Sequence, residues 1–182
     1  MSGHNKWSKV KNKKAATDAK KSQIFSKISK LVASESKKAG GNADSPGLRA
    51  AIEKGKSANM PSDNIERAIK KGMSGKEADL QSVLYEAYAQ GGSALLIEVL
   101  SDNRNRTSAE IKHILSKNGA SLASPGSATW AFEKTSSGWE TKTAVPVNAE
   151  DAEKLENLME ELEDNEDVQD VHSNAEYGAE KE

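Results

Sequence analysis

The stretch ALLIEVLSDNRNRTSAEIKHILSKNG, residues 94–119, indicates the fold of the second half of the chain. Residues 94–100 form a nearly continuous apolar run, which is typical of a central strand with both faces buried. The polar residues 101–107 follow, and apolar residues then recur at helical spacing until Asn118-Gly119, a typical helix end. We therefore predict a buried strand, a polar loop and an amphipathic helix in this order.

The polar loop is a candidate for both structural and functional roles. Thr107 is expected to cap the following helix, with Glu110 three residues later completing a capping box. Two interpretations of Arg104 and Arg106 stay open. The two arginines can clamp a phosphate group with help from the helix N-terminus, or Asp102 and Asn103 can form turns and pair with them, so that the loop is purely structural.

Strand and helix patterns continue on both sides of this stretch. Residues 82–89 predict a strand that joins the central one through a turn at Gly91-Gly92. Downstream, the patterns predict strands at 127–133 and 139–147, a helix at 149–163 capped by Asn148, and a last strand at 167–173, with a frayed end after Asn174. The order β-β-α-β-β-α-β predicts an α+β fold, a ferredoxin-like α/β sandwich with a mostly antiparallel sheet.

The first half of the chain is predicted to be helical. The patterns indicate a helix at 17–39, a second that opens at Ser45-Pro46, and a third that opens at Met60-Pro61-Ser62 and ends at Gly72. Three short amphipathic helices can share one core, and the segment 72–79 is expected to be a linker. We therefore predict a basic helical domain at 1–75 (an arm plus three helices), a ferredoxin-like domain at 76–175, and a disordered tail at 176–182.

The net charge of −2 hides a strong asymmetry between the two halves. Residues 1–76 carry 18 Lys or Arg and 6 Asp or Glu, whereas residues 77–182 carry 8 basic and 22 acidic residues. Such a split favours binding of a polyanion by the basic half. The alternative is a solvated basic face that binds nothing.

Lysine dominates the basic half, and its flexible point charge suits contact with the phosphate backbone better than reading of base edges. The residues predicted to contact nucleic acid are Lys6, Trp7, Lys9, Lys11, Lys13, Lys14, Lys20, Lys21, Lys27, Arg104 and Arg106. Trp7 can stack on a base or pack on the first helix, and the sequence leaves both open.

Several functional classes find no support in the sequence. There is no Cys, and His4, His113 and His172 lack metal-ligand spacing, so we expect no metal and no cofactor. No catalytic motif or phosphate-binding loop occurs, so we expect neither an enzyme nor a small-molecule substrate. No apolar run is long enough to span a membrane, and the first residues lack the apolar stretch of a secretory signal. We expect a cytoplasmic monomer.

Short motifs in both halves resemble a known family. They are GHNKW at residues 3–7, KNKKAA at 11–16, NMP at 59–61 and, most specifically, SDNRNRT at 101–107. These motifs are similar to those of the YebC/PmpR family, which is described as a family of transcriptional regulators with mitochondrial translational activators among its relatives. The resemblance implies a DNA-binding transcriptional regulator, or alternatively an RNA- or ribosome-associated translation factor.

The chain departs from the family pattern at two places. Residues 85–92 read YEAYAQGG where the family usually has YEGYGPGG, so the shape of this turn is expected to differ. The family also usually inserts a third domain after the equivalent of Phe132-Glu133-Lys134, and here only residues 135–142 bridge the gap. We therefore predict a short form that lacks the inserted third domain.

Overall fold

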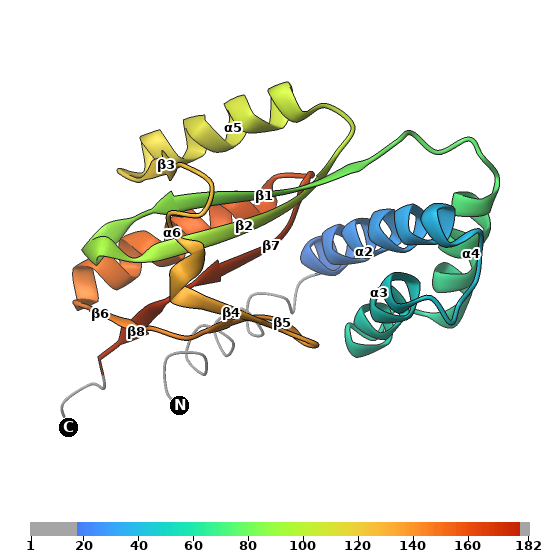
Figure 1. The fold of residues 1–182 in the computed structure, drawn as a ribbon, viewed down its shortest axis with the longest axis horizontal. Coiled ribbons are helices and arrows are strands. Elements are labelled where there is room, and N and C mark those ends of the chain that lie inside the picture. The colour runs from blue at the N-terminus through green and yellow to red at the C-terminus, as the bar shows by residue number, and fades with distance from the viewer. Residues whose placement is uncertain (1–17, 179–182) are drawn as a thin grey trace. The chain divides into compact units, whose positions relative to one another are not determined.

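A computed structural model describes residues 18–178 of the chain (Figure 1). These residues fall into two compact units that divide between Leu80 and Gln81. We call residues 18–80 the helical unit and residues 81–178 the sheet unit, and describe each by itself. Among residues 18–178, no helix combines the length and the apolarity that a membrane crossing requires.

The helical unit contains α2 (Asp18–Ala39), α3 (Pro46–Ser57) and α4 (Ser62–Met73). Prolines mark the starts of α3 and α4, as the sequence predicted. Pro46 lies in the first turn of α3, and Pro61 is the residue immediately before α4. Helix α2 ends at Ala39, just before Gly40 and Gly41, because both glycines adopt positive φ angles that stop the helix. The helices predicted for this half are therefore present with nearly the predicted bounds.

The core of the helical unit is built from one apolar stripe of each helix. Ile28 and Val32 of α2, Leu48 of α3, and Ile65 and Ala68 of α4 are all buried in a single cluster. This spacing places one side chain per helical turn on the inner face, which is why the pattern could be recognised in the sequence. Burial of these side chains fixes which faces of α2 and α4 remain at the surface.

Gly72 does not end α4, as the sequence pattern suggested, because the helix runs on to Met73. A Cβ atom at Gly72 would collide with the carbonyl oxygen of Ala33. Only glycine therefore lets α4 approach α2 this closely. The close approach of the two helices also allows a hydrogen bond between them, in which Ser36 Oγ of α2 donates to the carbonyl of Ile69 in α4 at 2.8 Å.

The sheet unit is built on a four-stranded antiparallel sheet. Its strands lie in the order β3 (Ser121–Ala123), β1 (Gln81–Tyr88), β2 (Ala94–Ser101) and β7 (Val168–Ser173). Helix α5 (Arg104–Lys117) connects β2 to β3, which run parallel to each other with β1 between them. This is the split β-α-β arrangement of a ferredoxin-like α+β fold, and α6 (Ala149–Asp164) is the second helix of the unit.

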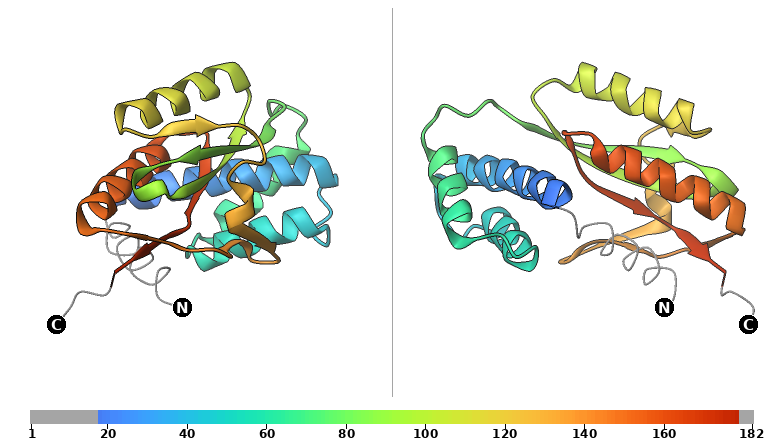
Figure 2. Two further views of the ribbon diagram at one scale, coloured as in Figure 1. Left: turned by 60° about the vertical axis from the view of Figure 1, so that its left-hand side comes forward. Right: turned by 180° about the vertical axis from the view of Figure 1, so that it is seen from behind.

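Strand β2 is buried on both faces, as its continuous apolar run predicted. Leu95 and Ile97 point into a core shared with α5 and α6, and Figure 2 shows these two helices on the same face of the sheet. Leu96 points the other way, into a smaller cluster with Ala131 and Phe132. Those two residues belong to the 3₁₀ turn Thr129–Ala131 and to β4 (Phe132–Thr135), which partly cover the second face.

The structure corrects the predicted strands between residues 121 and 147. The edge strand β3 was not predicted, and the predicted strand 127–133 is a 3₁₀ turn followed by β4. The predicted strand 139–147 is two short strands, β5 (Gly138–Thr141) and β6 (Val145–Val147). The reason is that these strands have only three or four residues each, which is too short for a clear alternation of apolar and polar side chains.

The chain also stays ordered beyond Asn174, where the sequence predicted fraying. Strand β8 (Ala175–Tyr177) pairs in parallel with β6, with Val145 opposite Ala175 and Val147 opposite Tyr177. The ladder continues from Asn174, whose carbonyl accepts a hydrogen bond of 2.9 Å from the amide of Val145. This pairing corrects the predicted disordered tail for Glu176 and Tyr177, and residues 179–182 lie outside the described part.

Glu86 is a buried carboxylate that braces the segment leading to β4. It accepts hydrogen bonds from the amides of Gly126 (2.5 Å), Ala128 (2.6 Å) and Thr129 (3.0 Å). We predict that Glu86→Ala lowers the free energy of unfolding by about 2–3 kcal/mol, because the buried amide of Ala128 and two less buried amides would lose their acceptor. Denaturant unfolding measures this, with Glu133→Ala, an exposed glutamate of β4, as the control. A loss of stability no larger than that of Glu133→Ala would contradict the stabilising role of Glu86.

Candidate nucleic-acid interface

The predicted lysine contacts divide between described and undescribed residues. Lys20, Lys21 and Lys27 lie on α2, with Lys21 fully at the surface and the other two half-buried. Lys6, Trp7, Lys9, Lys11, Lys13 and Lys14 lie outside the described residues. Their role in nucleic-acid binding, and the choice between stacking and packing for Trp7, therefore stay predictions.

The charge asymmetry of the sequence follows the division into units. Residues 18–80 carry 13 Lys or Arg and 8 Asp or Glu, whereas residues 81–178 carry 7 basic and 18 acidic residues. Much of the negative charge lies on α6, whose sequence AEDAEKLENLMEELED has one Lys among its acidic side chains. An electrostatic attraction for a polyanion therefore belongs to the helical unit and not to the sheet unit.

The loop after β2 differs from its prediction at the cap. Helix α5 begins at Arg104, and its N-cap is Asn103, whose side chain accepts a hydrogen bond of 3.1 Å from the amide of Arg106. The predicted cap, Thr107, is buried in the first turn, where its Oγ1 bonds the carboxylate of Asp167 at 2.5 Å. Asn caps helices as well as Thr does, and burial of Thr107 beside a carboxylate leaves it unable to serve as the cap.

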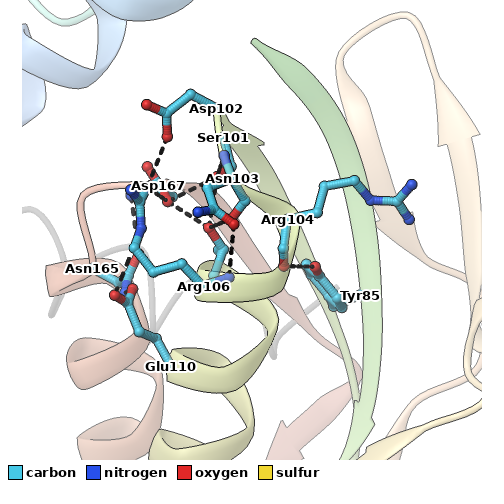
Figure 3. Close-up of polar contacts among 10 residues, drawn as sticks. Tyr85, Ser101, Asp102, Asn103, Arg104, Arg106, Glu110, Asn165 and Asp167 are labelled. Carbon is cyan, nitrogen blue, oxygen red and sulfur yellow. Dashed lines mark hydrogen bonds and ion pairs between the residues drawn. The ribbon is translucent and has the colours of Figure 1, made fainter.

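Asp167 is the centre of this arrangement (Figure 3). One of its oxygens, Oδ2, accepts hydrogen bonds from Ser101 Oγ (3.1 Å), Thr107 Oγ1 (2.5 Å) and Arg106 Nη2 (2.8 Å). Asp167 precedes β7, so the contacts join the end of β2, the start of α5 and the start of β7. A buried carboxylate with several donors is stable where an unpaired one would not be.

The two arginines of the loop have different roles in the structure. Arg106 pairs with Asp167 at 2.8 Å and with Asp102 at 3.0 Å, and its Nε lies 3.8 Å from Glu110. The hydrogen bond with Asp167, followed by that with Asp102, raises the pKa of Arg106 above its ordinary value. The guanidinium is thus paired with carboxylates of the protein although the side chain is 46% exposed, and the structural interpretation of the loop describes Arg106 alone.

Arg104 points away from this cluster (Figure 3). It is exposed, and within residues 18–178 its guanidinium has no hydrogen-bonding partner. Its backbone carbonyl accepts a hydrogen bond of 3.4 Å from the hydroxyl of Tyr85 on β1, which attaches the first turn of α5 to the sheet. The structure therefore leaves Arg104 available for an outside anion, while the charge of Arg106 is balanced by carboxylates.

The third histidine has acidic neighbours that the sequence did not suggest. His172 Nε2 lies 2.9 Å from Glu98 Oε2 across β7 and β2, and ligand atoms of Asp170, His172 and Glu98 lie within 4.8 Å of one another. The hydrogen bond between His172 and Glu98 explains the position of this glutamate in an otherwise apolar strand. The pair becomes a salt bridge when the imidazole is protonated.

The fold and the loop define a class: proteins with a basic three-helix unit followed by an acidic α+β unit that carries an Asn-capped arginine loop. Residues 5–75 match the family model "TACO1/YebC protein N-terminal domain". Residues 80–138 and 135–175 match the model "TACO1/YebC second and third domain". The chain belongs to the TACO1/YebC family, which confirms the resemblance seen in the sequence.

Individual relatives agree with this assignment. The chain is 46% identical over 136 residues (74% of this chain, 54% of the relative) to a protein of Fervidobacterium nodosum named "Probable transcriptional regulatory protein". A protein of Dictyoglomus thermophilum with the same name is 41% identical over 147 residues (80% and 59%). The chain thus spans little more than half the length of these curated relatives.

A solved structure shares the fold. The crystal structure of a conserved hypothetical protein from Aquifex aeolicus superimposes with a TM-score of 0.78 at 29% identity, covering 90% of this chain and 93% of that chain. The second family model matches in two pieces that meet at residues 135–138, where the structure has the tight turn between β4 and β5. The two-piece match and the tight turn at residues 135–138 both fit a short form without the inserted domain.

Proposed function

We propose that this chain is a nucleic-acid-binding regulator of gene expression whose helical unit contacts the phosphate backbone of duplex DNA. The observation that carries the proposal is the agreement between charge and architecture, because the excess of basic residues ends where the helical unit ends. The acidic sheet unit then orients the molecule by repelling the phosphates. The names of the relatives support a transcriptional role.

The chemistry of the helical unit favours backbone contact over base reading. Of its 13 basic residues, only Arg49 and Arg67 are arginines, and bidentate arginine is the commonest reader of base edges. Neutralisation of phosphates by lysine releases counterions, so the affinity should fall steeply with salt. We expect moderate affinity with little preference for sequence.

This lysine-rich composition also supports a second candidate function. Structured RNA and ribosomes present the same phosphate chemistry as duplex DNA, and shape rather than sequence governs recognition of double-stranded RNA. A role as an RNA- or ribosome-associated translation factor is therefore the alternative proposal.

Binding titrations over a salt series separate the transcriptional from the translational role. The full chain is titrated with duplex DNA, with a structured RNA of equal length and with ribosomes, each over a series from about 0.05 to 0.3 M salt. Retention on DNA at salt that releases the other two supports the transcriptional role. Retention on ribosomes at salt that releases DNA contradicts it and supports the translational role.

We expect Arg104 to be the sheet unit's contribution to the interface. Arg104→Ala should weaken nucleic-acid binding about three- to tenfold, since it removes one charge-assisted phosphate contact, and should leave the melting temperature unchanged. Lys112→Ala removes an exposed charge two turns further along α5 and is the matched control. Equal effects of the two substitutions would show that Arg104 contributes only through net charge.

A further inference from the structure

A groove runs along the surface of the helical unit between α2 and α4. Ser29 and Lys30 line it from α2, Arg67 and Lys71 line it from α4, and Ala33 and Ala68 are among the small side chains that complete its wall. The segment after α4 borders it through Glu77 and Leu80. All of these residues belong to the helical unit, so the groove is a feature of that unit alone.

The lining of the groove combines positive charge with neutral donors. Lys30, Arg67 and Lys71 supply cationic groups, and Ser29 supplies a hydroxyl. Arg67 lies along its own helix, where its Nε donates to the carbonyl of Asp63 at 3.3 Å and its Nη2 contacts Asn64. Cations and hydroxyl donors are the groups that proteins use to hold phosphate oxygens.

The carboxylate of Glu77 in the linker satisfies part of this positive charge, and Lys37 beside the groove holds the linker in place. Glu77 Oε1 lies 2.6 Å from Lys71 Nζ, and the glutamate side chain is 19% exposed while that of Lys71 is 70% exposed. Lys37 Nζ contacts both the carbonyl of Glu77 (2.9 Å) and Asp79 Oδ1 (2.5 Å). The linker thus bends back over the helical unit and places the carboxylate of Glu77 at the rim of the groove.

We propose that the α2–α4 groove binds a backbone phosphate of nucleic acid, and that Glu77 is its intramolecular competitor. The inference rests on the proposed function and assigns a specific site and an internal regulator to it. A phosphate that enters the groove takes the place of the Glu77 carboxylate on Lys71. Binding then removes one contact that holds the linker segment 74–80 on the helical unit, while the contacts of Lys37 remain, so nucleic acid and the Glu77 carboxylate compete for the same cation.

The test compares four variants of the full chain in duplex-DNA and structured-RNA titrations: Glu77→Gln, Glu53→Gln, Lys71→Gln and the double variant Lys71→Gln/Glu77→Gln. Glu77→Gln should tighten binding about two- to fivefold, since an ion pair with one exposed partner is worth about that factor. Glu53→Gln is the control for net charge, because it removes the same charge and a more exposed ion pair, Glu53–Lys56 at 2.9 Å, on α3 of the same unit. The Lys71→Gln background should abolish the gain from Glu77→Gln, which is the non-additivity expected of a direct competitor. Equal gains from Glu77→Gln and Glu53→Gln would overturn the proposal.

A second readout separates the groove from the function. Pyrophosphate is titrated into the wild-type chain while amide NMR shifts are recorded, and we expect the largest changes at residues 29–33, 67–71 and 77–80. If no nucleic acid binds but pyrophosphate moves these amides, the proposed function fails and the groove is a phosphate site for another ligand. If nucleic acid binds without moving them and pyrophosphate leaves them unchanged, the groove fails and the function stands.

Discussion

Replacement of Lys13, Lys14, Lys20 and Lys21 by Glu is expected to lower the affinity for nucleic acid roughly 100-fold or more at near-physiological salt. Each reversal removes a phosphate contact and adds a repulsive charge next to the same backbone. Lys20 and Lys21 lie in the first turn of α2, away from the core residues Ile28 and Val32. The fold should therefore survive, and circular dichroism with a titration over a salt series measures both effects.

The control for this variant carries the same change in net charge in the other unit. It replaces Lys112, Lys117, Lys134 and Lys142 of the sheet unit by Glu. All four are exposed, and we expect a loss of affinity of less than about tenfold from the long-range field alone. If both variants lost affinity to the same extent, the chain would bind through its overall charge, and the placement of the interface on the helical unit would be wrong.

Asp167→Ala is expected to lower the free energy of unfolding by about 3–5 kcal/mol, because the two buried hydroxyls of Ser101 and Thr107 lose a charged acceptor, at about 1.5–3 kcal/mol each. The substitution removes the acceptor of Ser101, Thr107 and Arg106. Three elements meet at this carboxylate, so the start of α5 should loosen as well. Urea unfolding measures the stability, and hydrogen exchange of the α5 amides measures the loosening.

Asp102→Ala is the matched comparison for Asp167→Ala. Asp102 also pairs with Arg106, at 3.0 Å, but its side chain is 51% exposed. Exposed pairs contribute little, so we expect no measurable change in stability. A similar loss from both variants would mean that Arg106, and not the buried carboxylate, determines the stability of the loop. A negligible loss from Asp167→Ala would contradict the central role of this residue.

The parts of the fold that the sequence predicted well depend on local patterns. The helices of the first half were predicted from the spacing of apolar residues and from Pro46 and Pro61. Each of these signals lies within a few residues of the helix that it predicts. Asn148 was predicted to cap α6, and its side chain accepts a hydrogen bond of 2.8 Å from the amide of Asp151. Strand β2 was recognised because a short, continuous apolar run is typical of a strand with both faces buried.

The parts that were missed depend on contacts between distant residues. The pairing of β6 with β8 brings Val145 next to Ala175. Each strand has only three residues, and so short a segment carries no pattern that predicts the pairing. The role of Thr107 was misjudged because Asp167 lies 60 residues away. Asn103 was a recognisable alternative cap, since it stands just before the helix and Asn is a preferred N-cap residue. Local signals thus predict elements, whereas the distribution of roles between Arg104 and Arg106 requires the fold.

The most direct test of the central claim is to locate the contact itself. Nucleic acid carrying photoreactive bases is cross-linked to the wild-type chain, and the modified peptides are identified by mass spectrometry. We predict that cross-links concentrate in residues 1–80, with a further one near Arg104, and that the acidic helix α6 is free of them. Cross-links concentrated on the sheet unit, with the lysines of α2 unmodified, would contradict the account.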